Sequence, residues 1–286
     1  MKNRELASHL VVPVILCFIF YLLQLPQRLS LRIEQDAGKS PGRDMGMPYD
    51  QFVLFGDSLF QHSSSQERGY TLAPALQAGA LRPSRLPKCH GDISPARMFH
   101  SKLTVVRLEY IRRLDVINRG FSGYNTNQAV KVVEHVVPDT SVARVRFLVV
   151  FFGANDSCLK GAAGSQHVPL ERYTRNLEAI LTHERVMKQK PRIIVVTPPP
   201  INEYATEEND RSKGYLEPRR KANHTKLYAD AARNVADAHG VTVLDLYTVL
   251  MRHAGQRDGD PVLEGSKEKP PNPQLRRLLH DGSSIA

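Results

Sequence analysis

Short apolar runs recur along the chain from residue 52 onward, and each predicts a β-strand. They are largely continuous rather than alternating between apolar and polar positions: Phe52–Phe55, Val116–Ile117, Arg146–Phe152, Ile193–Val196 and Val241–Leu246. Strands that are apolar on both faces are covered on both faces, as in a parallel sheet between two layers of helices. The pattern therefore predicts a parallel sheet of five strands.

Segments with helical spacing of apolar residues lie between these runs. The predicted helices cover Leu72–Leu76, Asn127–Val137, Leu170–Met187 and Arg219–His239. Regular alternation of strand and helix is typical of α/β proteins. We predict a flavodoxin-like three-layer sandwich with a doubly wound sheet, in which the active cleft lies outside the carboxyl ends of the strands.

The N-terminal region does not follow this alternation. Leu10–Leu23 is an apolar run of 14 residues, interrupted only by Pro13. As a helix it would be about 21 Å long, shorter than the ~30 Å hydrocarbon core of a bilayer. It is typical of a signal peptide or a marginal membrane anchor, and the alternative is a helix packed on the domain surface. Residues 24–47 have the composition of a linker, so we predict an N-terminal segment at 1–47 and a catalytic domain at 48–286.

Two stretches inside the predicted domain are atypical. Residues 81–107 have no clear period, and a structureless insertion of this length is uncommon within a compact domain. They also carry six basic residues and one acidic residue, a large part of the chain's formal net charge of +10. No nucleic-acid-binding module accompanies this charge, so we do not expect a nucleic-acid partner. The second atypical stretch is the C-terminal end, which begins with the polar, proline-rich segment Glu264–Pro273.

Composition sets broad limits on the class of protein. Hydrophobic residues make up 41% and charged residues 24% of the 286 residues, as in ordinary globular proteins. The three cysteines cannot form a disulfide framework, and they show no metal-binding spacing. These observations exclude a disordered or multi-span membrane protein and favour a reduced compartment.

Candidate chemistry lies directly after three of the predicted strands. Ser58 follows the first in Gly56-Asp57-Ser58, Gly120 follows the second, and Asn155 follows the third. A serine there could be a nucleophile, while a glycine N–H and an asparagine amide could stabilise an oxyanion. Each motif alone also fits an ordinary turn or helix cap. Their occurrence at three successive strand ends favours a catalytic site.

These motifs resemble the blocks of the SGNH, or GDSL-type, serine hydrolases. The resemblance rests on Phe55–Leu59, Asn118–Thr126, Phe151–Cys158 and Thr197–Pro200, with Leu244–Tyr247 near the end. Within that family the chain is most similar to the isoamyl acetate-hydrolysing esterase group, particularly its fungal members. The resemblance implies hydrolysis of short-chain acyl esters on a flavodoxin-like fold, with a small-molecule ester as substrate and with no metal or other cofactor.

The resemblance also assigns roles to individual residues. Ser58 would be the nucleophile, and the oxyanion hole would combine the backbone N–H groups of Ser58 and Gly120 with the side chain of Asn155. Asp281 would belong to the C-terminal catalytic block, whose histidine would stand three residues later. That position is Ser284, so the sequence predicts an esterase with much reduced activity.

Two other histidines are alternatives for the base. His280 is adjacent to Asp281, and His62 lies four residues after Ser58. Neither spacing gives the geometry that a general base must satisfy, so neither is favoured. The atypical insertion and the missing histidine both fit an error in a gene prediction or a splice variant, and the sequence does not decide between these.

Other functions and the location of the protein stay open at this point. A non-catalytic protein that binds acyl or acetylated ligands, or an acyltransferase that uses the same serine, would share these motifs.

Asn155–Ser157 and Asn223–Thr225 match the glycosylation pattern that matters only in secreted chains. A glycan on Asn155 would block the oxyanion hole, so a cytoplasmic catalytic domain is slightly favoured over a secreted one. Membrane association would run through residues 10–23, and the sequence says nothing of the oligomeric state.

Overall fold

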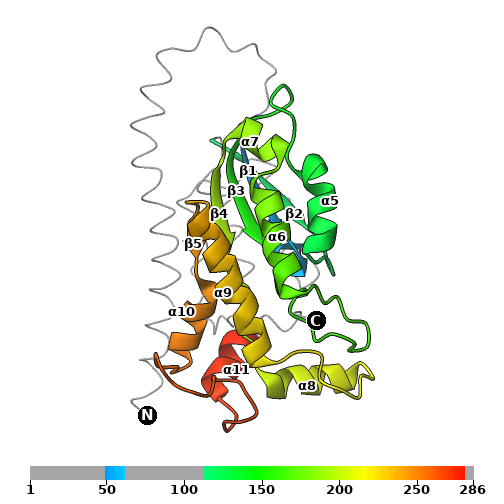
Figure 1. The fold of residues 1–286 in the computed structure, drawn as a ribbon, viewed down its shortest axis with the longest axis vertical. Coiled ribbons are helices and arrows are strands. Elements are labelled where there is room, and N and C mark those ends of the chain that lie inside the picture. The colour runs from blue at the N-terminus through cyan, green and yellow to red at the C-terminus, as the bar shows by residue number, and fades with distance from the viewer. Residues whose placement is uncertain (1–48, 62–112, 281–286) are drawn as a thin grey trace, which may run out of the picture. The chain divides into compact units, whose positions relative to one another are not determined.

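The centre of the molecule is a parallel β-sheet. The computed structural model describes residues 49–61 and 113–280. The strands are β1 (Gln51–Gly56), β2 (Asp115–Gly120), β3 (Val145–Phe151), β4 (Arg192–Val196) and β5 (Thr242–Leu244), arranged in the order β2-β1-β3-β4-β5 (Figure 1). Every neighbouring pair is parallel. The predicted five-stranded, doubly wound α/β sheet is therefore confirmed.

Helices follow the strands in the alternation expected of this fold. They are α2 (Ser58–Gln61), α5 (Thr126–Val136), α6 (Leu170–Leu181), α7 (Glu184–Gln189), α8 (Glu203–Ser212), α9 (Ala222–Ala238), α10 (Leu246–His253) and α11 (Pro273–His280). Figure 1 shows α5, α6 and α9 side by side in front of the sheet. The helices α8 and α11 lie together at the lower end of the view.

The hydrophobic core explains why the strand sequences are apolar throughout. Val53 and Phe55 of β1 face the layer of α5, α6 and α9, in one cluster with Leu148 of β3. Phe52, which points to the opposite face of the sheet, is also buried and stacks on Phe147 with ring centroids 5.2 Å apart. Both faces of the central strands therefore lose water on folding, which is the main favourable contribution to stability.

Local capping fixes the start of α5, the helix that follows β2. The Asn125 side chain accepts from the Gln128 N–H at 3.3 Å, and the Gln128 side chain accepts from the Asn125 N–H at 2.8 Å. This reciprocal capping box satisfies two N–H groups that would otherwise lack a partner. The helix stops before Pro138, which cannot continue it. The helix predicted at Asn127–Val137, with its cap at Asn125 or Thr126, agrees with this element.

The long helix predicted over Leu170–Met187 is wrong as a single element. It is divided into α6 and α7 at Thr182 and His183. His183 takes an extended conformation and caps α7, because its Nδ1 accepts from the Arg185 N–H at 3.2 Å. The apolar period continues across the break because Val186 of α7 is buried in the same core as α6. Hydrophobic spacing alone could not show the interruption.

Several predictions fall on residues outside the described part of the chain. They concern the apolar run Leu10–Leu23, the helix at Leu72–Leu76 and the insertion at 81–107. The proposed division at residue 47 is not tested. Within the described ranges, 49–61 and 113–280, none of the helices is both long enough and apolar enough to span a bilayer.

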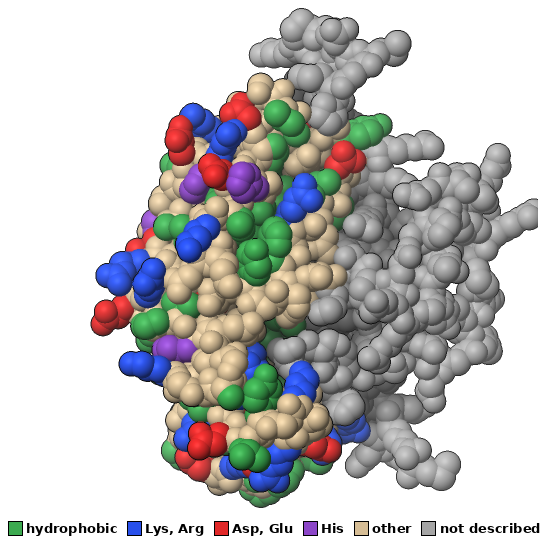
Figure 2. Space-filling model, turned by 90° about the vertical axis from the view of Figure 1, so that its right-hand side faces the viewer, with side chains coloured by type: hydrophobic (Ala, Val, Ile, Leu, Met, Phe, Trp, Pro, Cys, Tyr) green, Lys and Arg blue, Asp and Glu red, His purple; other side chains and the backbone are tan. Residues whose placement is uncertain are grey.

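The surface carries charges of both signs. On the face drawn in Figure 2, acidic and basic side chains are interspersed and the apolar side chains lie in small groups. The large apolar side chains that are most exposed come from separate elements and loops: Tyr49, Val142, Met187, Leu216 and Leu227. Scattered exposed apolar residues are normal for a protein surface.

Candidate active site

Ser58 lies at the carboxyl end of the central strand. β1 ends at Gly56, and Ser58 is the first residue of α2. The Asp57 carbonyl accepts from the Phe60 N–H at 3.2 Å, which starts the helical turn immediately after the strand. A Cβ at Gly56 would lie 2.7 Å from both the Phe151 carbonyl oxygen and the Phe60 ring, so a larger residue would not fit. The glycine therefore permits the tight turn that places Ser58 at the edge of the sheet.

The end of β2 packs closely against α2. A Cβ at Gly120 would lie 2.1 Å from the backbone nitrogen of Gln61. The Gly120 N–H, which the sequence predicts as an oxyanion donor, donates instead to Asn118 Oδ1 at 2.9 Å. The other end of the Asn118 amide donates to the Phe60 carbonyl at 2.7 Å. The backbone of β2 therefore lies very close to that of α2 at Gly120, and the Gly120 N–H is already hydrogen-bonded.

The loop after β2 offers a different amide. The N–H groups on either side of Gly123 all have acceptors. The N–H groups of Phe121 and Tyr124 donate to the carbonyl oxygens of Gly56 and Phe121, respectively. The N–H groups of Ser122, Asn125 and Thr126 donate to the side-chain oxygens Gln61 Oε1, Gln128 Oε1 and Asp156 Oδ1. The Gly123 N–H has none within residues 49–61 and 113–280. Gly123 also has a φ of +78°, a conformation that favours glycine. Its amide is therefore a candidate oxyanion donor that the sequence analysis missed.

Asn155, which follows β3, is oriented by two neighbours. Its Nδ2 donates to the Tyr124 carbonyl at 2.8 Å, which uses one of the two amide hydrogens. Arg220 approaches the same side chain, with Nη2 3.5 Å from Asn155 Oδ1 and Nε 3.3 Å from the Ala154 carbonyl oxygen. The contact with Tyr124 joins the end of β3 to the loop after β2. Among the described residues, the second amide hydrogen of Asn155 has no acceptor, so it can donate to a ligand.

Two buried carboxyl groups, those of Asp57 and Asp156, are adjacent in the sequence to Ser58 and Asn155. Asp57 Oδ1 accepts from the Leu59 N–H at 2.9 Å, and Asp156 Oδ1 accepts from the Thr126 N–H at 2.9 Å. Burial, with a smaller contribution from the nearby Asp156 carboxylate, raises the pKa of Asp57 to about 7. Burial likewise raises the pKa of Asp156 to about 6. Removing a carboxylate from water disfavours its charged form, so Asp57 holds its proton over much of the acidic range.

The raised pKa of Asp57 predicts a pH-dependent stability. The unfolded chain releases this proton near pH 3.8 and the folded chain near pH 7. The folded state therefore loses stability relative to the unfolded state as the pH rises between these values. Because Asn carries no such proton, Asp57→Asn should gain stability relative to the parent protein between pH 5 and pH 8. Urea denaturation midpoints at the two pH values measure the effect.

The exposed carboxyl of Asp139 supplies the matched control for this experiment. Hydrogen bonds from Ser141 lower the pKa of Asp139 below its ordinary value. That group is ionised at both pH values, so the effect of Asp139→Asn should be the same at pH 5 and pH 8. If the effect of Asp57→Asn on stability is also the same at pH 5 and pH 8, Asp57 is ionised at both pH values.

The catalytic base is not found among the described residues. Asp281, Ser284 and His62 lie outside them, and of His280 only the backbone is described. Within the described ranges, Ser58 has no hydrogen bond to a histidine. The same ranges hold no group of three or more His, Cys, Asp or Glu side chains that could bind a metal ion. The described part of the site thus supplies a serine hydroxyl and hydrogen-bond donors for an oxyanion.

Arg220 is a site residue that the sequence analysis missed. It is buried, although arginine is rarely buried in proteins. In the sequence it stands in the basic run Arg219–Lys221, at the start of a predicted helix, but α9 begins only at Ala222. No signal in the sequence distinguishes its inward position from that of a solvated neighbour such as Lys221.

The chain is similar to known proteins over most of its described length. The profile of the GDSL-like Lipase/Acylhydrolase family matches residues 54–265. The isoamyl acetate-hydrolyzing esterase 1 homolog of Rattus norvegicus is 37% identical over 210 residues, which cover 71% of this chain and 69% of the relative. The protein of the same name from Homo sapiens is 38% identical over 214 residues, covering 74% and 73%.

More distant similarities extend to plants and bacteria. A GDSL esterase/lipase of Arabidopsis thaliana is 35% identical over 146 residues, 49% of this chain and 60% of that relative's length. Among solved structures, the lipase/acylhydrolase from Enterococcus faecalis is similar with a TM-score of 0.47 and 20% identity, covering 82% of this chain and 93% of the other. The family profile and the mammalian relatives show that the chain belongs to the GDSL-like lipase/acylhydrolase family and is by family an esterase.

Proposed function

We propose that the protein hydrolyses carboxylic esters with short, acetate-type acyl groups and that Ser58 is the nucleophile. The observation that supports this most strongly is the meeting of three strand ends. Ser58 follows β1, Gly123 lies in the loop after β2 and Asn155 follows β3. β1 lies between β2 and β3 in the sheet, at the topological switch point where ligands bind in such folds. The names of the mammalian relatives support the acetate-ester class.

The proposed reaction uses the hydrogen-bond donors that the described residues leave free. The Ser58 Oγ attacks the ester carbonyl carbon, and the carbonyl oxygen becomes an oxyanion. The backbone N–H groups of Ser58 and Gly123, together with the second amide hydrogen of Asn155, stabilise this charge. The proton that Ser58 Oγ loses passes to the base of the C-terminal block and from it to the leaving oxygen, so collapse of the intermediate releases the alcohol and leaves an acyl group on Ser58. Water then attacks the acyl carbon, the carboxylic acid is released, and a proton returns to Ser58 Oγ. Gly123 replaces Gly120 in this proposal because the Gly120 N–H is already bonded to Asn118.

The proposal includes a much reduced rate for the chain with serine at position 284. A serine hydroxyl is a weak nucleophile unless a neighbouring base takes its proton. The family resemblance places histidine at position 284, where Ser284 stands, and no described histidine is bonded to Ser58. This favours, as a second candidate, a protein that binds esters without turning them over. An acyltransferase that uses Ser58 would need the same base.

The role of Asn155 can be tested by removing its amide. Asn155→Ala should lower turnover of p-nitrophenyl acetate by about 10²–10³-fold, since one oxyanion donor is lost. The substitution also leaves the Tyr124 carbonyl without its donor, so we expect a stability loss of about 1–3 kcal/mol without unfolding. The assay uses a chain completed with the C-terminal block of a relative, including histidine at 284.

Asn176 provides a matched control. Its side chain donates two internal hydrogen bonds, to Thr126 and Asn127 at 3.0 and 2.9 Å, and none to the loop after β2. Asn176→Ala should therefore lose stability with little loss of turnover. If both variants lose turnover in proportion to their stability, Asn155 is a structural residue and not an oxyanion donor.

A further inference from the structure

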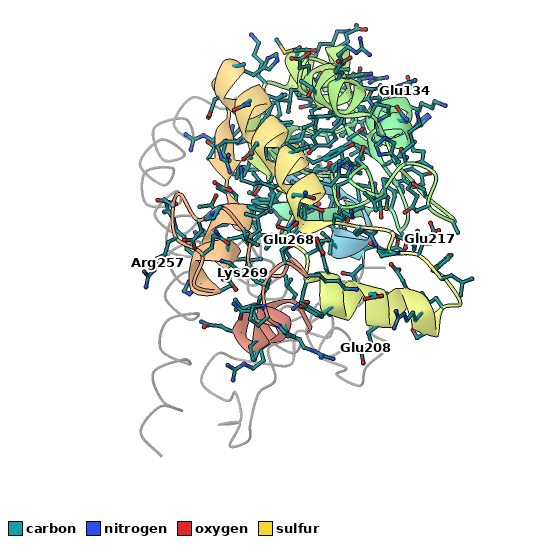
Figure 3. All side chains as sticks on the ribbon, turned by 60° about the horizontal axis from the view of Figure 1, so that its bottom comes forward. Glu134, Glu208, Glu217, Arg257, Glu268 and Lys269 are labelled. Carbon is teal, nitrogen blue, oxygen red and sulfur yellow. The ribbon has the colours of Figure 1, made fainter. Side chains whose placement is uncertain are left out.

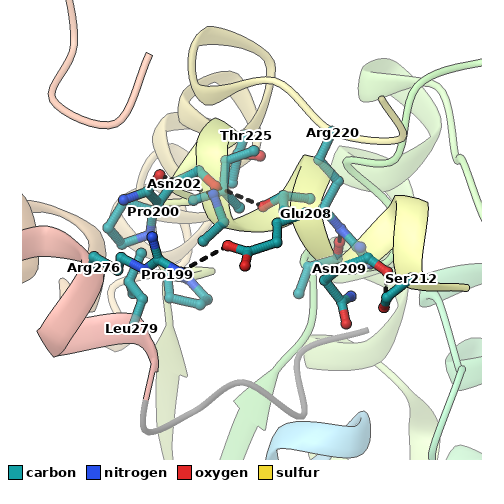
Figure 4. A pocket seen from close by; sticks show the side chains of 14 residues that line it. Pro199, Pro200, Asn202, Glu208, Asn209, Ser212, Arg220, Thr225, Arg276 and Leu279 are labelled. Atoms are coloured by element: carbon teal, nitrogen blue, oxygen red, sulfur yellow. Dashed lines mark hydrogen bonds and ion pairs between the residues drawn. The ribbon is translucent and has the colours of Figure 1, made fainter. Parts of the chain in front are cut away.

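A pocket opens beside Asn155, at the carboxyl ends of β3 and β4. It has a volume of about 370 Å³, within the range of about 300–1,000 Å³ that is usual for small-molecule sites. The loop after β4 forms one side, and residues of α8 and α11 form the other sides (Figure 4). Arg220 and the half-buried Asn209 contribute polar groups to a lining that is otherwise rich in alanine and proline.

Arg220 is buried in this lining with part of its guanidinium group unused. The residue is 3% exposed and lines the pocket. Its Nε donates to the Ala154 carbonyl at 3.3 Å, and its Nη2 lies 3.5 Å from Asn155 Oδ1. Both distances exceed the usual range of about 2.7–3.2 Å for such bonds. Nη1 is buried and has no hydrogen-bond partner within residues 49–61 and 113–280. Two N–H donors of a charged group are therefore left for a ligand.

The positive charge of Arg220 also lacks an acidic partner. In the described part of the chain, no Asp or Glu side chain forms an ion pair with Arg220. The adjacent Arg219, by contrast, lies 4.0 Å from Asp210. A buried charge that is unpaired is costly, and an anion that enters the pocket would lower this cost.

The two buried carboxyl groups of the site leave this charge largely uncompensated in mildly acidic solution. Burial raises the pKa of Asp57 to about 7, although the positive charge of Arg220 opposes the rise. At pH 6 the Asp57 carboxyl is therefore mostly neutral. The Asp156 carboxyl accepts instead from the N–H and the hydroxyl group of Thr126.

The other charged residues of the lining neutralise each other. Glu208 of α8 forms an ion pair with Arg276 of α11 at 2.7 Å. Figure 3 looks onto this end of the molecule and shows Glu208 on α8, with α11 beside that helix. The described lining thus offers one uncompensated positive charge, that of Arg220. A group with a single negative charge matches it, whereas a dianion would bring a second charge that has no partner.

We propose that Arg220 binds the carboxylate of a substrate in this pocket. The inference rests on the proposed esterase function and adds a substrate class to it: acylated hydroxy acids, in which a short acyl group is joined to an alcohol that carries one carboxylate. Guanidinium and carboxylate groups form strong, charge-assisted hydrogen bonds. Because Arg220 also contacts Asn155, the bound substrate would lie next to the residue proposed to bind the ester oxygen.

The product of such a reaction is a hydroxy acid, which probes the pocket without turnover. The test measures binding of 4-hydroxybutanoate and 4-hydroxybutanamide to the 286-residue chain at pH 6 by ligand-observed NMR titration. The two probes are similar in size and differ in charge. The parent protein should bind the carboxylate at least tenfold more tightly than the amide. Arg220→Gln should remove this preference, and circular dichroism and the melting temperature show whether the variant is folded.

Asn209→Asp tests the same claim without altering Arg220. It adds a negative charge to the pocket wall at nearly constant side-chain size, so it should weaken 4-hydroxybutanoate binding at least tenfold and leave the amide unaffected. Gln274→Glu is the matched control, because it adds the same charge to α11 at an exposed position that does not line the pocket. That variant should bind both probes as the parent does.

Three results would overturn the inference: no preference of the parent for the carboxylate, a preference that persists in folded Arg220→Gln or in Asn209→Asp, or an equal loss in Gln274→Glu. If Arg220→Gln does not fold, Asn209→Asp decides. A completed chain that hydrolyses p-nitrophenyl acetate but shows no preference for the carboxylate would contradict this inference alone. A chain that prefers the carboxylate but hydrolyses neither 4-acetoxybutanoate nor p-nitrophenyl acetate, even with a completed C-terminal block, would contradict the esterase function alone.

Discussion

Ser58→Ala is expected to abolish hydrolysis of p-nitrophenyl acetate in a chain completed with the C-terminal block of a relative and histidine at 284. The reaction needs an oxygen that forms a bond to the acyl carbon, and alanine has none. Loss of the nucleophile in a serine hydrolase costs on the order of 10⁶-fold in turnover. The fold should be retained, because Ser58 is half-buried and the turn that it starts is held by Asp57 and Phe60.

Ser157→Ala serves as the control for this experiment. Ser157 lies near the site, and its hydroxyl donates to the Ala154 carbonyl at 3.2 Å. That variant should keep most of its activity. If Ser58→Ala is folded and keeps more than a few per cent of the activity, another residue is the nucleophile and the assignment of Ser58 is wrong.

The second large effect concerns the catalytic base. The 286-residue chain is expected to hydrolyse p-nitrophenyl acetate at close to the background rate and to react poorly with a fluorophosphonate probe. Without one member of a catalytic triad, serine hydrolases keep only ~10³–10⁴-fold catalysis over water, far below the full rate. Ser284→His alone should recover little, because a histidine needs neighbouring groups that hold it in position. A relative's complete C-terminal block should restore both reactions.

The competing explanation is that His280 or His62 already acts as the base. In that case the unmodified chain would turn over esters at a normal rate, and His280→Ala or His62→Ala would abolish the activity. An assay of the unmodified chain beside these two variants separates the explanations. A normal rate that survives both substitutions would contradict both explanations.

The central strands β1 and β3 could be predicted from the sequence because both of their faces are buried. Phe52 and Phe55 point to opposite faces of the sheet and are equally shielded from water, so the run between them is apolar throughout. Helix α8 was not predicted, since the sequence over Glu203–Ser212 is dominated by polar and charged residues and only Asp210 is buried within it. A helix that covers a pocket with part of one face leaves little apolar period to detect.

The sequence predicted those site residues whose positions are set by the end of a strand. Ser58 and Asn155 follow neighbouring strands, so the topology brings their segments together. The choice between Gly120 and Gly123 was not predictable, because it depends on the side chain of Asn118 folding back onto the Gly120 amide. The inward position of Arg220 likewise depends on where α9 begins.

Mapping of the fluorophosphonate adduct tests the central claim most directly. The completed chain, with a relative's C-terminal block and histidine at 284, would be labelled, digested and analysed by mass spectrometry. The proposed mechanism predicts a single modified peptide that carries the adduct on Ser58, with labelling lost in Ser58→Ala. An adduct on any other residue, or equal labelling of Ser58→Ala, would contradict it.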